Sequence, residues 1–176
     1  MLKGLEVTIA NDPPDGTLIS FTLDSNNNFT QTAATRTNIT VTTSAASGYI
    51  VTAWETQLMT CSAANCGVET TIPNFTYCEY SGPCLWTALC KDNLNYCGFG
   101  FTSSDPEVGG VSNNRYGDGT KYTYFPTNSS NPVRVMDYGG PVSSQSYLIT
   151  YRISASLTQR PGPYTTTIVY IITAQY

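Results

Sequence analysis

Apolar and polar side chains alternate with a period of two along residues 164–176. One face of this segment would carry Tyr164, Thr166, Ile168, Tyr170, Ile172, Ala174 and Tyr176. All of these except Thr166 are apolar or aromatic. A period of two predicts a β-strand with one face against a core. At ~3.3 Å per residue, a single strand of this length would span ~40 Å, so we expect a long closing strand.

The same alternation recurs along the rest of the chain. Shorter strands are predicted at residues 5–10, 19–23, 39–43, 49–54, 96–102, 122–125, 133–136 and 147–155. Segments rich in glycine, proline, asparagine and serine separate them, as expected for turns and loops. Little of the chain has a helical period. The pattern predicts an all-β fold, a two-sheet antiparallel β-sandwich of the Ig-like or jelly-roll-like kind.

The first predicted strand is set apart from the others by two prolines. Leu5, Val7 and Ile9 alternate with more polar neighbours, and Pro13 and Pro14 then interrupt the pattern. We therefore divide the chain into an N-terminal strand with its linker, residues 1–16, and a sandwich, residues 17–176. Such a strand could insert into a neighbouring subunit and complete its sheet. The alternative is an ordinary first strand that pairs within its own domain.

Composition narrows the class of protein. Of the 176 residues, 40% are hydrophobic, enough for a core, and only 11% are charged, less than half the usual ~25%. The net charge is −4, and the eight lysine and arginine residues form no basic stripe, which argues against a nucleic-acid partner. No apolar run reaches the ~18 residues of a membrane span. Residues 1–7 lack the apolar stretch of a signal peptide, so we expect prior removal or another export route.

Six cysteines fall within one short insertion, residues 61–97. They are Cys61, Cys66, Cys78, Cys84, Cys90 and Cys97. Zinc normally takes closely spaced cysteine pairs, often with histidine, and the chain has no histidine. We therefore predict disulfides formed in an oxidising compartment, with free thiols and metal as the alternatives. The connectivity stays open. A short helical turn is expected at residues 84–90.

Four asparagines stand in N-glycosylation sequons: Asn28, Asn38, Asn74 and Asn128. Glycosylation at these sites would agree with an extracellular location. The alternative is chance, because a chain rich in asparagine and threonine produces sequons without selection for them.

Aromatic side chains are the candidate ligand contacts. Trp86 lies in the cysteine-rich insertion and is expected to be exposed, where its ring could stack on a sugar. Trp54 ends a strand, and we expect it in the core.

Catalysis is not predicted, since a chain without histidine cannot form a Ser-His-Asp or Cys-His site. Asp105 and Glu107 could pair as two carboxylates, but the prolines and glycines around them indicate a solvated loop. Asn113, Asn114 and Asp118 could offer oxygens to calcium, but a Gly/Asn turn is the simpler interpretation. We expect no cofactor.

Four segments, residues 46–52, 96–101, 147–153 and 163–174, follow one another in a familiar order. With them the chain resembles secreted bacterial β-sandwich proteins of the cell surface, pilin-like or adhesin-like. Many of these end in a Gly-x-Tyr-Thr-x-Thr-Ile-x-Tyr strand, here Gly162 to Tyr170. The resemblance skips the cysteine-rich insertion. It implies a surface-exposed protein without catalytic residues.

The sequence therefore predicts a non-enzymatic structural subunit of an extracellular filament or cell-surface assembly. Its partner would be further copies of itself, joined head to tail through Leu5, Val7 and Ile9. The alternative is a monomeric adhesin or carbohydrate-binding module that recognises host or matrix glycans.

Overall fold

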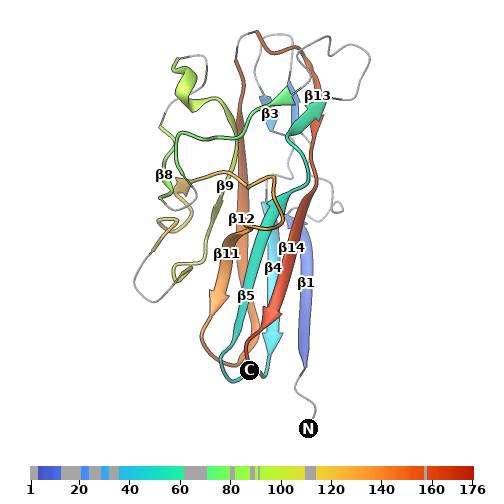
Figure 1. The fold of residues 1–176 in the computed structure, drawn as a ribbon, viewed down its shortest axis with the longest axis vertical. Coiled ribbons are helices and arrows are strands. Elements are labelled where there is room, and N and C mark those ends of the chain that lie inside the picture. The colour runs from blue at the N-terminus through green and yellow to red at the C-terminus, as the bar shows by residue number, and fades with distance from the viewer. Residues whose placement is uncertain are drawn as a thin grey trace.

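The protein is built almost entirely of antiparallel strands in a computed structural model (Figure 1). The structure describes residues 4–12, 21–23, 29–31, 36–61, 71–79, 82–87, 90, 92–109, 114–156 and 158–176. The strands are β1 (Leu5–Asp12), β2 (Phe21–Leu23), β3 (Phe29–Gln31), β4 (Arg36–Thr43), β5 (Tyr49–Glu55), β6 (Met59–Cys61), β7 (Thr71–Ile72), β8 (Cys84–Leu85), β9 (Gly98–Ser103), β10 (Lys121–Tyr122), β11 (Val133–Tyr138), β12 (Val142–Ser154), β13 (Gly162–Thr165) and β14 (Ile168–Ala174). One 3-10 turn, η1, spans Leu94–Tyr96.

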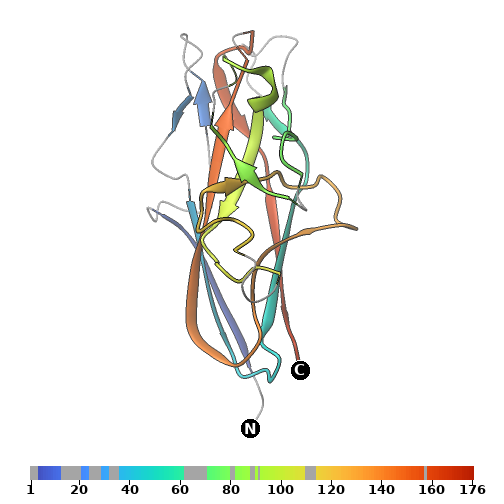
Figure 2. The same ribbon diagram turned by 90° about the vertical axis from the view of Figure 1, so that its left-hand side faces the viewer.

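Two layers of strands enclose the main core. One layer is a sheet in the order β1-β4-β12-β9, and the other contains a sheet in the order β11-β5-β14. Figure 2 shows the layers from the side, with β1, β4 and β12 in one and β5 and β14 in the other. The hydroxyls of Tyr151 and Tyr170 hydrogen-bond between the layers at 2.6 Å. The predicted two-sheet antiparallel sandwich is confirmed.

The alternation read from the sequence follows the burial of the central strands. In β4 every second residue, from Thr37 to Thr43, is buried, and in β5 the buried positions run from Tyr49 to Glu55. Threonines occupy several of the outward positions between them, because β-branched side chains suit a pleated, half-solvated surface.

The closing strand differs from its prediction. Residues 164–176 do not form one strand: β13 ends at Thr165 and β14 begins at Ile168. β13 belongs to a second sheet, in the order β3-β2-β13-β6-β7, whereas β14 pairs with β5. At the break the Thr166 hydroxyl donates to the Gln57 carbonyl at 2.5 Å, and the Thr56 N–H donates to the Thr167 carbonyl at 2.9 Å. The connection between β5 and β6, the strands that pair with β14 and β13, lies beside this break.

The cysteine-rich segment forms a small core of its own. Phe75, Cys78, Trp86 and Tyr96 are buried together, with Cys84 and Tyr122 packed against them. The short sheet of β8 and β10 lies beside this cluster. The helical turn expected at residues 84–90 is wrong, since Cys84 and Leu85 are a strand. The one helical turn among the described residues is η1, ten residues further along.

Candidate functional sites

β1 lies at the edge of its sheet and, in the part of the chain that the structure describes, is hydrogen-bonded to another strand along one side only. It pairs with β4 from Leu5 opposite Thr43 to Asp12 opposite Arg36. Residues directly opposite one another in such a pair share a face. Leu5, Val7 and Ile9 therefore point to the core side, like their buried partners on β4. The strand predicted at residues 5–10 is thus present and, in the single chain, pairs within its own sheet, which is the alternative given above to insertion into a neighbour.

The core side of β1 is incompletely covered. Leu5 is 38% exposed and Ile9 39% exposed, whereas Ile39, directly opposite Ile9, is fully buried. The facing sheet explains the difference, because it has three strands against four. Tyr170 of β14, the last strand of the facing sheet, hydrogen-bonds to Tyr151 of β12. β14 therefore contacts β12. β1 is left beyond the end of the facing layer.

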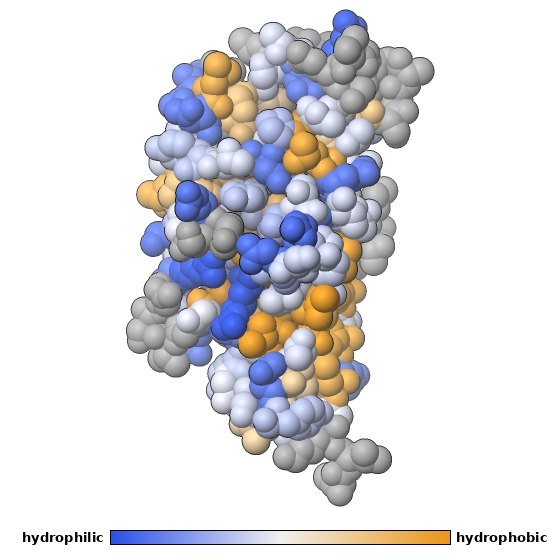
Figure 3. Space-filling view, in the orientation of Figure 1, coloured by the Kyte–Doolittle hydropathy of each residue, from blue (hydrophilic) through white to orange (hydrophobic). Residues whose placement is uncertain are grey.

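β14 is the second unpaired edge on this side of the sandwich. It pairs with β5 and has no neighbour on its other side among the described residues. Its inward side chains are only half-buried. We call the inward residues of the two strands the open edge: Leu5, Val7, Ile9, Ile168, Tyr170 and Ile172. Figure 3 shows hydrophobic surface gathered at the lower right, where Figure 1 places β14 and β1.

The outer face of β5 and β14 extends this apolar surface. Ile171 is 45% exposed, and Trp54 is half-buried opposite Val169. The expectation that Trp54 lies in the core is wrong, because the inward positions of β5 fall on Ala53 and Glu55, one residue to either side.

Disulfides hold the cysteine-rich segment. Cys78 is bonded to Cys84 and Cys90 to Cys97, and Cys61 is also disulfide-bonded. Cys66 lies outside the described residues. The Cys90 N–H donates to the Ser154 hydroxyl of β12 at 2.8 Å, which ties this bridge to the main sandwich. Disulfides of this kind form in an oxidising compartment.

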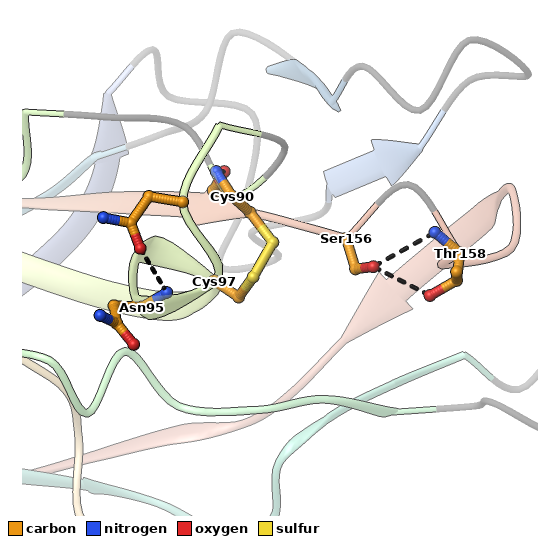
Figure 4. Close-up of a disulfide and its surroundings, with 7 residues drawn as sticks. Cys90, Asn95, Cys97, Ser156 and Thr158 are labelled. Carbon is orange, nitrogen blue, oxygen red and sulfur yellow. Dashed lines mark hydrogen bonds between the residues drawn. A yellow bond between two sulfur atoms is a disulfide. The ribbon is translucent and has the colours of Figure 1, made fainter.

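Figure 4 shows how the Cys90–Cys97 bridge lies across the η1 turn. The turn begins after Asn93, whose side-chain oxygen accepts a hydrogen bond from the Asn95 N–H at 3.0 Å. The bridge and this cap fix the position of the turn from both ends.

The expectation that Trp86 is exposed is wrong. Its ring is 4% exposed and stacks on Phe75 with centroids 3.7 Å apart. The Arg152 guanidinium carbon lies over the same ring at 4.9 Å from its centroid, and Arg152 also donates to the Trp86 carbonyl at 2.8 Å. Trp86 is therefore the centre of the small core, because this segment has few aliphatic side chains with which to form one.

A pocket opens beside Tyr77, a residue that the sequence did not single out. Its volume is about 470 Å³, and it is lined by Pro73, Asn74, Thr76, Tyr77, Leu94 and Asn95. We call it the Tyr77 pocket. Tyr77 is 51% exposed and packs on Tyr96 with ring centroids 4.7 Å apart. The sequence offered one signal for this site: Tyr77 is an aromatic residue directly before a cysteine, Cys78.

The sequons differ in their surroundings. The Asn128 side chain is exposed in a loop and accepts from the Ser130 N–H, and Asn38, on β4, accepts from the Ser146 hydroxyl. At Asn74 the amide nitrogen, the atom that would carry a glycan, donates inward to the Phe125 carbonyl at 3.0 Å. A glycan at Asn74 would have to break this bond. Asn28 lies outside the described residues.

Of the two carboxylates considered for catalysis, that of Asp105 is hydrogen-bonded within the fold. Asp105 is fully buried, not solvated as expected, and accepts from the N–H groups of Glu107 and Asp137, both at 2.9 Å. Burial raises the pKa of Asp105. Among the described residues, no three cysteine, aspartate or glutamate side chains are grouped to hold a metal ion.

The turn considered for calcium is closed on itself. Asn114 and Asp118 bond to one another, through the Asn114 amide at 3.1 Å and the Asp118 N–H at 2.9 Å. Asn113 lies outside the described residues.

A second buried carboxyl group belongs to Glu55, the last residue of β5. It is fully buried, and neither side-chain oxygen has a hydrogen-bond partner among the described residues. Burial raises its pKa from 4.5 to about 7, and the Asn74 side chain opposes this in part. Glu55 is therefore largely neutral in mildly acidic solution.

No helix among the described residues is long and apolar enough to cross a membrane. Comparison with known proteins found no matching family model, no matching curated protein and no matching solved structure.

Proposed function

We propose that this protein is a structural subunit of an extracellular or cell-surface assembly, and that it polymerises by donating β1 to a neighbouring subunit. The main support for the proposal is that, among the described residues, β1 pairs with β4 alone, and that Leu5 and Ile9 are more than a third exposed on the side that faces the core. β1 is thus an edge strand of its layer, and its release would break the pairing with one strand, β4.

Exchange of β1 costs little at equilibrium. A neighbour's β1 would make with β4 the same hydrogen bonds, in the same register, that the chain's own β1 makes. In the proposed polymer, further surface of the neighbour would cover the open edge. Covering what remains exposed of Leu5 and Ile9 contributes about 1 kcal/mol for each side chain. The exchanged form can therefore be more stable than the closed one.

The sequence after β1 favours an exchanged arrangement. β1 ends at Asp12, and Pro13 and Pro14 follow. Two prolines cannot continue a ladder, and they stiffen the connection to the rest of the chain. In the exchanged form the donated strand and the accepting edge of β4 belong to different subunits. Such a contact is head to tail and builds an open chain.

The remaining support is chemical. Disulfides at five described cysteines indicate an oxidising compartment. Uncharged polar side chains occupy most of the outward positions of β4, and charged residues make up only 11% of the chain. This composition fits a role as an extracellular scaffold better than a role in binding nucleic acids or membranes.

A cross-strand disulfide tests the proposal. Thr8 and Thr40 are directly opposite, and both lie on the outward face. In the variant Thr8→Cys/Thr40→Cys a bridge would lock β1 onto its own β4 without touching the core. We expect the wild-type chain to form polymers visible by electron microscopy and gel filtration, and the locked variant to stay monomeric.

The two single-cysteine variants are the matched controls and should polymerise like the wild type. Val7→Asp places a charge on the inward face of β1 and should also stop polymerisation, whereas Thr8→Asp, on the outward face, should not. Polymers formed by the locked variant would show that β1 is not the coupling element.

A further inference from the structure

We propose that the Tyr77 pocket binds a neutral sugar, with one pyranose ring lying on the exposed face of Tyr77. This inference is independent of the assembly proposed above. The pocket lies in the cysteine-rich segment, and the open edge belongs to β1 and β14. A binding site on one side of a subunit and an assembly edge on another can operate together.

The aromatic platform is already in place. One side of the Tyr77 ring packs on Tyr96, and half of the residue's surface remains in water. A hydrogen bond with Tyr96 raises the pKa of the Tyr77 hydroxyl. A pyranose ring presents a face of C–H groups that can cover such a ring, and its hydroxyls remain at its rim.

Polar groups around the ring match those hydroxyls. The side chains of Thr76 and Asn95 line the pocket, and neither makes a hydrogen bond within the part of the chain that the structure describes. A hydroxyl and an amide both donate and accept, as sugar hydroxyls do. No carboxylate, lysine or arginine is among the described residues that line the pocket. The lining therefore favours an uncharged, polyhydroxylated ligand.

Both walls of the pocket are held by disulfides. Tyr77 precedes Cys78, which is bonded to Cys84. η1, which carries Leu94 and Asn95, is followed by Cys97, which is bonded to Cys90. Walls that are fixed before binding lose little conformational entropy on binding. The volume of about 470 Å³ lies in the usual range for small-molecule pockets.

Binding of a panel of neutral sugars tests the proposal. The panel holds glucose, mannose, galactose, N-acetylglucosamine and their short oligomers, with glucuronate as the charged comparison. The full chain is produced in a host without N-glycosylation, so that no covalent glycan at Asn74 can fill the site. Titration is followed by calorimetry and by NMR shifts of the asparagine side-chain amides. We expect at least one neutral sugar to bind and to move the Asn95 amide signal.

Variants then assign the site. Tyr77→Ala should weaken binding at least about tenfold, because the stacking surface is lost, and Tyr77→Phe should stay within about threefold of the wild type. Asn95→Ala should weaken binding by several fold. Tyr138→Ala is the matched control: Tyr138 is also an exposed tyrosine, at 37%, but lies on β11, away from the pocket. Its affinity should be unchanged.

The outcomes divide cleanly. Loss of binding in Tyr77→Ala with an unchanged melting temperature supports the site. If that variant unfolds, Asn95→Ala, an exposed substitution, decides in its place. Absence of binding for every sugar of the panel, tighter binding of glucuronate than of the neutral sugars, or an affinity in Asn95→Ala equal to that of the wild type overturns the proposal.

Discussion

Glu55 is the residue whose chemistry departs furthest from its usual behaviour. A carboxyl group in a dry interior tends to keep its proton, because the charged form loses its hydration. Glu55 is fully buried, and its oxygens have no partner among the described residues. Its pKa is accordingly about 7 in the folded state, against 4.5 for an ordinary glutamate. This raised pKa links folding to pH.

Folding stability should fall as the pH rises from about 4.5 to about 7. In that window folded Glu55 holds a proton that the unfolded chain has released, so each rise in pH favours unfolding. The difference between the two pKa values corresponds to about 3 kcal/mol. Glu55→Gln should remove this loss. Urea unfolding at pH 4.5 and pH 8 measures it in both proteins.

The matched control is Glu6→Gln, at an exposed position of β1. It should keep the wild-type dependence on pH. Asp105, whose pKa is also raised by burial, contributes a slope of the same sign, which remains in all three proteins. Equal slopes in Glu55→Gln and the wild type would contradict the raised pKa of Glu55.

At single residues the sequence was informative about which side chains share a face and poor about how deeply each is buried. Alternation placed Leu5, Val7 and Ile9 on one face, as found. It gave the wrong environment to Trp54, which faces outward, and to Trp86, which is buried against Phe75. The burial of a tryptophan outside a long strand depends on which segments fold over it. In this protein disulfides help to determine which segments fold over Trp86, and the spacing of the cysteines does not predict how they pair.

The turn between β4 and β5 depends on one glycine. Gly48 has a φ of +76°, and a Cβ at this position would lie 1.8 Å from the Tyr138 carbonyl oxygen. The Gly48 carbonyl also accepts the Gln175 N–H at 2.8 Å, which joins the turn to the end of β14. The close approach of two backbone segments therefore requires a residue without a side chain.

Gly48→Ala should destabilise the protein by more than about 2 kcal/mol, since it adds a backbone clash to the cost of a positive φ. Gly119→Ala is the matched control. Gly119 has a φ of +85°, but a Cβ added there would meet nothing within 4 Å, so the substitution should cost only about 1 kcal/mol. Chemical denaturation of both variants gives the comparison, and equal losses would rule out the clash.

Elements were predicted best where a strand pairs along its whole length. β5 and β12 fall where the alternation placed them, with ends shifted by a few residues. β3 was missed, because Phe29 to Gln31 is too short to carry a period. The division of residues 164–176 into β13 and β14 was also missed, since Thr166 and Thr167 do not disturb the alternation. Only their bonds to Gln57 and Thr56 reveal the bend.

The molecule as a whole separates its two candidate surfaces. The open edge belongs to β1 and β14, on one side of the sandwich in Figure 1, and η1, which forms a wall of the Tyr77 pocket, lies on the other side. The main core and the small aromatic core are distinct clusters. A change confined to the small core should therefore leave the open edge intact.

Removing the Cys90–Cys97 bridge tests this independence. Cys90→Ala/Cys97→Ala frees the short loop closed by the bridge, at a cost of about 2.5 kcal/mol to the segment, and loosens η1 with its Asn95. Sugar binding should fall at least as far as in Tyr77→Ala, whereas polymers should form as in the wild type. The locked variant Thr8→Cys/Thr40→Cys should do the reverse and bind sugar normally as a monomer. Near-ultraviolet circular dichroism shows whether the main core of the bridge variant is still folded. If it is folded and both sugar binding and polymerisation are lost, the two surfaces are coupled. The coupling would then run through the hydrogen bond between Cys90 and Ser154 of β12.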